Sequence, residues 1–275
     1  MNNYRNSYQG WFVYLVLLFV LFWFSYPYLW MLLSTAKTNQ EIYQPNRLFP
    51  ERLELSSFYI LFTEENIPFV KAFLSSFIIA LVQAVLSVVI TALAAYSVTQ
   101  KKSFYTVLLI LLSIAVIVLP RQMISISIFE WINTLGIHGG YFAVILPGTV
   151  SGIGILYFIQ IFKKIPREYM EITRIEGASG IRSFITITKM IIPALLTYGV
   201  LHFILAWNEH LLPLLLLDDH NRTLPLILTM LNDPSQRIPQ SVVMAASVFT
   251  VFPVFIIFAL MYRQFKSAMS DVLIH

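Results

Sequence analysis

The stretch Lys163–Phe184 reads KKIPREYMEITRIEGASGIRSF, and it interrupts an otherwise apolar half of the chain. Apolar runs near residues 141–162 and 190–213 stand on either side of it. Each run is long enough, at about 1.5 Å per helical residue, to cross roughly 30 Å of hydrocarbon. The stretch is therefore a charged connector between two expected membrane spans, and its charge holds it outside the bilayer.

The composition of the whole chain also indicates a membrane protein. Of its 275 residues, 58% are hydrophobic and 12% are charged, whereas soluble domains contain about 25% charged residues. The formal charge of +4 is spread along the chain without a basic block, which argues against nucleic-acid binding. The absence of cysteine excludes disulfides, thiol catalysis and cysteine-ligated metal sites. We expect an all-α, multi-pass membrane protein.

Six apolar segments are expected to form transmembrane helices within a single domain that covers residues 1–275. They lie near residues 11–33, 72–98, 105–120, 141–162, 190–213 and 241–262. The first segment is too long for the core of a signal peptide, so we expect it to stay as an anchor. Pro147 and the glycines that follow it predict a kink or close packing in the fourth segment.

The distribution of Lys and Arg predicts the orientation, because these residues are enriched in cytoplasmic loops. With the N-terminus inside, Lys101 and Lys102 and the segment 163–189 are cytoplasmic. Acids outnumber basic residues in the outer connectors 34–71 and 218–240. Both termini are then cytoplasmic, as an even number of spans requires. The first outer connector is too long for a plain loop, and a short outer helix is expected at 125–135.

The charged connector itself predicts two helices joined by a tight corner. Pro166 suits the first turn of a helix, and Tyr169, Ile172 and Ile175 fall near one face of it. A glycine, Gly177, then permits the backbone to end the helix, and Ser179 can cap the next one, which runs through Phe184 and Ile187. Such an elbow on the inner surface can transmit motion between a partner and the membrane spans. An ordinary surface connector is the other interpretation.

These residues resemble the inner-membrane permeases of ABC importers. The cytoplasmic loop of that family reads E-A-A, three residues, G, nine residues, I-x-L-P, and Glu171, Gly177 and Ile187 match it. The pattern also departs from the family, because Ile172 and Thr173 replace the two alanines, Glu176 replaces an aspartate, and Lys189-Met190 replaces Leu-Pro. Further motifs are similar to maltose-type G subunits of the carbohydrate-uptake branch: Asn46-Arg-Leu-Phe-Pro50, Leu93-Ala-Ala-Tyr96, Leu135-Gly136, Ala206-Trp-Asn208 and Tyr262-Arg-Gln-Phe265.

The resemblance implies a permease subunit that imports an oligosaccharide or related solute across the bacterial cytoplasmic (inner) membrane. It implies a second related permease, two cytoplasmic ATPase subunits that carry ATP and Mg, and an extracellular or periplasmic solute-binding protein. This chain lacks the G-x-x-x-x-G-K-[ST] motif, so it has no cofactor of its own and is not the ATPase. The residues implied in ATPase docking are Tyr169, Glu171, Ile172, Ile175, Glu176, Gly177, Ala178, Ser179 and Phe184.

Polar residues inside or next to the spans are the candidates for the solute pathway. Gln83 and His202 lie roughly 15 Å into the second and fifth segments, where an uncompensated polar group is costly. Both could offer hydrogen bonds to sugar hydroxyls, but a helix–helix hydrogen bond explains a lone Gln or His as well. Asn208 and Glu209 near the outer interface could contact solute or form a structural corner. Trp207 is expected in the interfacial aromatic belt.

An ion- or proton-coupled secondary transporter is the alternative function. That mechanism usually needs ionisable groups near the midplane, and His202 is the one such group there. An intramembrane enzyme is less favoured, because the chain contains neither H-E-x-x-H nor G-x-S-x-G.

Overall fold

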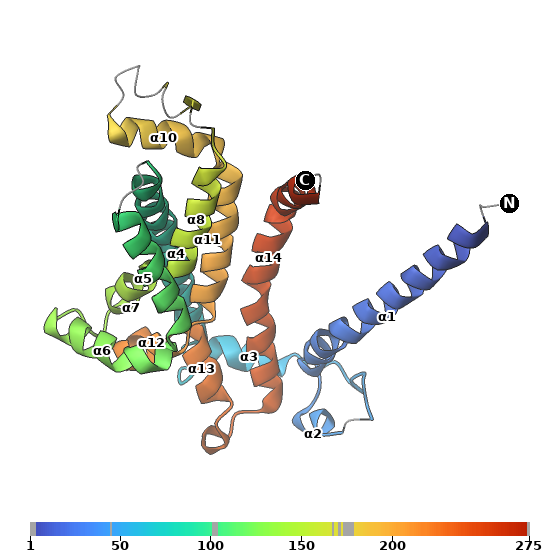
Figure 1. Cartoon of the computed structure of the whole chain (residues 1–275). Coiled ribbons are helices and arrows are strands. Elements are labelled where there is room, and N and C mark those ends of the chain that lie inside the picture. Colours follow the sequence, from blue (N-terminus) through green and yellow to red (C-terminus); the bar gives the residue numbers. More distant parts are fainter. Residues whose placement is uncertain are drawn as a thin grey trace. The chain divides into compact units, whose positions relative to one another are not determined.

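A computed structural model describes residues 4–44, 46–100, 104–166, 168–169, 172 and 179–273, with side chains over the parts of this range between 11 and 262. These residues are helical except for connectors and one isolated β-bridge between Gly139 and Leu217 (Figure 1). The helices are α1 (Tyr4–Ser34), α2 (Asn39–Ile42), α3 (Ser56–Thr63), α4 (Phe69–Thr99), α5 (Phe104–Val118), α6 (Arg121–Thr134), α7 (Tyr141–Thr149), α8 (Gly152–Lys163), α10 (Gly180–Met190), α11 (Ile192–Trp207), α12 (Leu211–Leu216), η1 (Asp219–Asn221), α13 (Leu224–Leu231), η2 (Pro234–Gln236) and α14 (Gln240–Leu273).

The described part of the chain contains three to six candidate membrane spans. Parts of α1, α4 and α14 are each long and apolar enough to cross a bilayer. Three bent pairs add up to three more: α5 with α6 at 108°, α7 with α8 at 42°, and α10 with α11 at 85°. The all-α membrane fold predicted from the sequence is therefore confirmed, whereas the count of six stays a prediction.

The breaks between helices follow the prolines and glycines of the sequence. A proline, Pro120, precedes α6, and α5 ends at Val118, so the expected stop of the third segment and the helix near 125–135 are both present. The kink expected in the fourth segment is the break at Val150 and Ser151 between α7 and α8. The fifth segment was expected to run to residue 213, and this was wrong: α11 ends at Trp207, where Asn208 takes a non-helical conformation.

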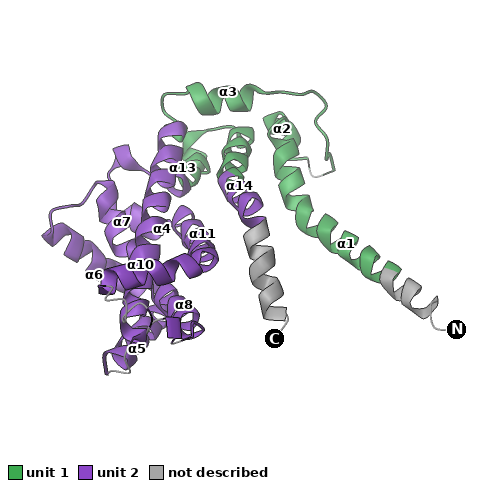
Figure 2. Ribbon diagram, turned by 90° about the horizontal axis from the view of Figure 1, so that it is seen from above, with its two compact units in different colours: residues 1–69, 227–252 green, residues 70–226, 253–275 purple. Residues whose placement is uncertain are grey.

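Two compact units divide the chain (Figure 2). The first comprises residues 1–69 and 227–252, and the second residues 70–226 and 253–275. The single domain expected over 1–275 stays a prediction.

The first unit contains α1 and an ordered connector after it. The part of α1 that forms a candidate span, Trp11–Ser34, has no buried residues in its most apolar window, as expected for a helix that contacts lipid or a partner. Lys37 is 2% exposed, and its Nζ donates to the Arg47 carbonyl oxygen at 2.6 Å. Thr38 and Glu41 form a reciprocal capping box on α2. The connector that follows α1 is therefore folded rather than a plain loop.

In the second unit α4, α5, α8 and α11 run side by side, and α10 crosses their ends (Figure 1). Close approach of α8 to α5 depends on Gly152, because a Cβ there would overlap the Ser113 carbonyl oxygen. Two apolar clusters form the core of this unit. One lies beneath α10, and the other joins α4, α6, α7 and α12 through residues such as Ile79, Ile132 and Leu216.

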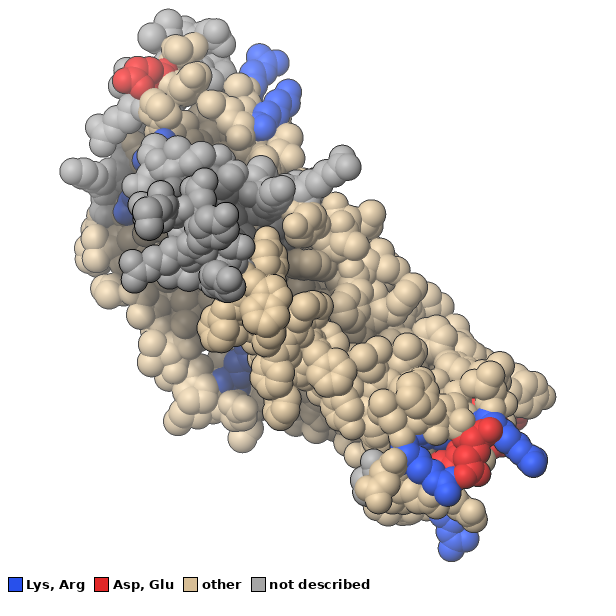
Figure 3. All heavy atoms as spheres, turned by 90° about the vertical axis from the view of Figure 1, so that its right-hand side faces the viewer, with Lys and Arg blue, Asp and Glu red and all other residues tan. Residues whose placement is uncertain are grey.

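The described charged side chains are few. On the face drawn in Figure 3 most of the described surface is uncharged, which suits helices that contact hydrocarbon. The connector 218–240 contains an element that was not expected from the sequence. It is α13, whose Leu224, Ile227 and Leu231 are almost fully buried.

Candidate functional site

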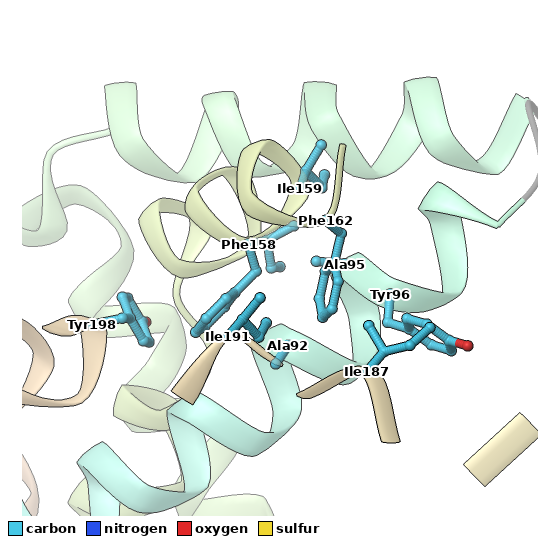
Figure 4. Close-up of a cluster of buried hydrophobic side chains, with 10 residues drawn as sticks. Ala92, Ala95, Tyr96, Phe158, Ile159, Phe162, Ile187, Ile191 and Tyr198 are labelled. Carbon is cyan, nitrogen blue, oxygen red and sulfur yellow. The ribbon is translucent and has the colours of Figure 1, made fainter. Parts of the chain in front are cut away.

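The first candidate site is the apolar cluster beneath α10, which we call the α10 cluster. It joins residues of α4, α8, α10 and α11 (Figure 4). Phe158, Phe162 and Ile187 are each at most 1% exposed, so the cluster is dry and closely packed. Its buried members are Ala92, Ala95, Tyr96, Ile155, Phe158, Ile159, Phe162, Ile187, Ile191 and Tyr198.

The α10 helix is anchored to this cluster at several points. Ser179 caps its first turn by accepting from the Arg182 N–H at 3.4 Å, as the sequence predicted. Phe184 packs on the cluster with its ring centroid 5.4 Å from that of Tyr96, and the Tyr96 hydroxyl donates to Ser183 Oγ at 3.1 Å. A displacement of α10 must therefore displace the ends of α4, α8 and α11 as well.

The other residues predicted to dock an ATPase are partly described. Tyr169 and Ile172 are about half exposed, at 49% and 50%. Glu171, Ile175, Glu176, Gly177 and Ala178 lie outside the described residues. The docking role of all of them stays a prediction.

The second candidate site is a polar network at the break between α7 and α8. Gln83 of α4 is 4% exposed and donates from Nε2 to the Val144 carbonyl oxygen of α7 at 2.9 Å. This is the helix–helix hydrogen bond that was one of its two interpretations. Gly148 lies against the same amide, because a Cβ there would overlap Gln83. Gln83 thus joins α4 to the end of α7.

His202 belongs to a neighbouring chain of hydrogen bonds. Its Nδ1 lies 3.3 Å from the Tyr198 hydroxyl, which lies 2.9 Å from Ser87 Oγ on α4. The ring is 5% exposed, and its Nε2 has no hydrogen-bond partner among the described residues, although the Gly148 backbone lies close by. Ser87 and Tyr198 were missed in the sequence. Their spacing from Gln83 and His202, four residues in each helix, was the available signal.

A small cavity of about 190 Å³ lies beside His202. Its walls come from α5, α6, the α7–α8 break and α11, and Arg121 lies at its rim. We call it the break cavity. Residues on its wall include Ile117, Ile124, Gly148, Ser151, His202 and Leu205.

The end of α11 at Trp207 is held by structural contacts. Glu209 forms an ion pair with Arg121, and its other carboxylate oxygen accepts from the Leu211 N–H at 3.0 Å. Asn208 is exposed, and its side chain donates to the Ile204 carbonyl oxygen at 2.8 Å. These contacts favour the corner interpretation of both residues. Trp207 is 1% exposed and packs between the rings of Phe73 and Phe203, and its expected depth at the membrane interface stays a prediction.

A family model described as "binding-protein-dependent transport system inner membrane component" matches residues 87–271. The chain belongs to this family. Its fold is that of a permease from a bacterial ABC transporter that imports the acidic polysaccharide alginate. The TM-score is 0.81 at 16% sequence identity, over 96% of this chain and 98% of the other.

Full-length relatives are found among sugar transport systems. The chain is 29% identical to the sulfoquinovosyl glycerol transport system permease protein of Agrobacterium fabrum, over 89% of this chain and 87% of the relative. It is 28% identical to the trehalose/maltose transport system permease protein of Thermococcus litoralis, over 87% of each chain.

The family membership confirms the resemblance drawn from the sequence. The protein is a multi-pass membrane permease component of an ABC importer, which implies ATPase and substrate-binding partners. The ion-coupled alternative is not favoured.

Proposed function

We propose that this chain is the permease subunit of an ATP-driven importer for an oligosaccharide or related sugar. The full-length similarity to permeases of sugar transport systems carries this proposal. The solute crosses the bacterial cytoplasmic membrane along a path that this chain shares with a second, related permease. Both termini lie in the cytoplasm, and a solute-binding protein delivers the sugar from outside.

Energy enters through two cytoplasmic ATPase subunits, which hold ATP and Mg. Residues from Tyr169 to Ser179 dock on these subunits, and α10 carries the motion inward. The contacts of α10 support this role. Ser179 caps its first turn, its axis makes an angle of 85° with that of α11, and it packs on the same apolar cluster as α4 and α8. ATP acts by favouring the conformation that its closed ATPase pair fits best.

The docking role is tested by reversing one charge in the loop. Glu171→Lys should leave the protein in the membrane and uncouple ATP hydrolysis from uptake, and Gly177→Pro should do the same. Glu168→Lys is the matched control, because it makes the same reversal three residues away from the family's glutamate. Amounts of assembled complex, ATPase activity and sugar uptake are measured for each variant in vesicles. Wild-type uptake in the Glu171→Lys and Gly177→Pro variants would overturn the docking role.

The sugar itself is identified by its effect on the rate of ATP hydrolysis. The purified complex is given a panel of binding protein–glycan complexes, and the class that stimulates ATP hydrolysis names the substrate. Uptake that stops without ATP but survives collapse of the proton gradient excludes the ion-coupled alternative.

A further inference from the structure

One face of α3, in the connector between α1 and α4, is exposed and largely aromatic. Tyr59 is 71% exposed and Phe62 is 47% exposed, and the two lie on the same face because three residues separate them. Ser56 lies on the other side of Tyr59 and is exposed as well. The opposite face of the helix is buried through Ser57 and Leu61. The exposed face therefore changes from aromatic rings at one edge to a hydroxyl group at the other.

The start of α3 is tied to the end of α1. Ser57 Oγ donates to the Thr35 carbonyl oxygen at 2.6 Å. Thr35 directly follows Ser34, which is the last residue of α1 and of its candidate span. Just before α3, the Glu54 N–H donates to the Ala36 carbonyl oxygen at 3.1 Å. The first turn of α3 thus lies where the chain leaves the membrane after α1.

The other end of α3 is tied to the start of α4. The ring centroid of Phe62 lies 5.8 Å from that of Phe69, at which α4 and its candidate span begin. Both rings pack edge-on against Phe249 of α14, at 5.2 Å and 6.1 Å between centroids, and α3 runs across α14 (Figure 1). Phe249 lies about 14 Å along α14 from its first residue, Gln240, where a candidate span also begins. A helix at this level lies beside a membrane span and not beyond its end.

Charge does not determine what this face binds. Residues 35–68 contain three basic and five acidic side chains, so anionic headgroups gain little from them. Lys37 is buried and donates to the Arg47 carbonyl oxygen, and the Arg47 side chain is paired with Glu51. The face instead offers apolar and aromatic surface at the depth of the membrane boundary. Tyrosine and other amphipathic rings are enriched at that depth.

We propose that α3 is an interfacial helix that lies flat in the leaflet in which α1 ends. Phe62 and Tyr59 insert at the boundary between the headgroups and the acyl chains, and Ser56 faces the headgroups and water. The partner of this face is a phospholipid surface, bound through apolar burial and without a need for anionic lipid. The helix then fixes the depth at which α1 ends and α4 begins. This inference goes beyond the proposed function and does not depend on the solute.

The cysteine-free chain allows single thiols to report on contact with lipid. Tyr59→Cys places a thiol on the aromatic part of the face, and Ser56→Cys is the matched control on the hydroxyl edge of the same helix. Each variant is labelled with bimane, assembled into the full complex and placed in phosphatidylcholine nanodiscs. A fraction of the lipid carries a nitroxide, either on the headgroup or near the start of the acyl chain. Because a nitroxide quenches bimane at close range, a protein that covered the face would prevent quenching.

The acyl-chain nitroxide should quench most of the emission at position 59 and little of it at position 56, where the headgroup nitroxide should quench more. Leu55→Cys, one turn before Tyr59 and at a residue that is 64% exposed, should behave like Tyr59→Cys. Phosphatidylglycerol or added salt should leave the quenching unchanged, because apolar burial is not screened.

Three results would overturn the proposal. The first is an absence of quenching at positions 55 and 59 by either lipid, which would mean that a protein partner or water covers the face. The second is equal quenching at positions 56 and 59 by each lipid. The third is quenching that requires phosphatidylglycerol. ATP-driven uptake, measured in the same preparations, shows that the labelled complexes are intact.

Discussion

The α10 cluster and the α7–α8 break lie in the same unit and are built in opposite ways. The cluster is dry and aromatic, and its two buried tyrosine hydroxyls, of Tyr96 and Tyr198, bond to Ser183 and Ser87. At the break, His202 and Ser151 line a cavity, and Gln83 bonds to α7 nearby. Close-packed apolar cores move as rigid bodies, whereas interrupted helices with alternative hydrogen bonds can change their angle. The difference teaches that one unit combines a rigid region with a region that can bend.

The largest expected effect comes from removing a buried ring from the α10 cluster. Phe162→Ala removes a ring that is 1% exposed and lies 5.5 Å from the ring of Tyr96, centroid to centroid. Loss of such a buried ring costs about 3–5 kcal/mol in well-packed cores. The purified complex should therefore aggregate at a clearly lower temperature. Phe142→Ala is the control, since Phe142 is 72% exposed, and its aggregation temperature should stay near that of the wild type. Equal losses in both variants would contradict a rigid α10 cluster.

A smaller effect is expected from adding a methyl group at the start of α8, next to the break. Gly152→Ala places a methyl group on the Ser113 carbonyl oxygen, so α5 and α8 must separate. Overpacking of this kind costs about 1–3 kcal/mol. Gly180→Ala at the start of α10 meets open space and should be neutral or slightly stabilising. Thermal stability of the two variants is compared in the same detergent, and a neutral Gly152→Ala would show that α8 does not need its close approach to α5.

Removing one hydrogen bond from each region should have a smaller effect on stability and still separates the two regions. Gln83→Met removes the bond to the Val144 carbonyl oxygen of α7, and Tyr96→Phe removes the bond to Ser183 in the α10 cluster. Helix–helix hydrogen bonds in membranes average about 0.6 kcal/mol, so both variants should stay folded. Uptake should fall more in Gln83→Met, because its bond holds the end of α7. Similar uptake in the two variants would remove the functional contrast between the regions.

Much of this contrast follows from residue types that are visible in the sequence. Pro147 and the glycines after it predicted the break, and Ser179 predicted the start of α10, because these residues act on the backbone next to them. Apolar runs predicted the helices for the same local reason. The end of α11 at Trp207 was missed, because the fifth run was expected to continue to residue 213.

Partners across helices could not be predicted, since hydrogen bonds such as Gln83 to Val144 depend on how the helices pack. Trp207 shows the limit most clearly. An aromatic residue near the end of a span fits the interfacial belt by position, yet packing against Phe73 and Phe203 buries it. The pairing of Arg121 with Glu209 likewise brings together two residues far apart in the chain, so the sequence could not indicate it.

The smallest expected effect lies in the turn at η1, which belongs to neither region. The Arg222 guanidinium donates to Asp219 Oδ1 at 2.7 Å and, together with its charge, holds the pKa of Asp219 below its ordinary value. The folded turn then binds a proton more weakly than the unfolded chain. The contact therefore stabilises the turn above the ordinary carboxyl pKa, about 4, and the stabilisation is lost as the pH falls through the lowered value.

Asp219→Asn should make the turn insensitive to pH in this range. Hydrogen exchange at the Asn221 amide, which donates to the Asp218 carbonyl oxygen at 2.9 Å, measures the difference. Because Asp219 is 86% exposed along its side chain, the effect should be small. A parallel loss of protection in wild type and variant would exclude the ion pair as its cause.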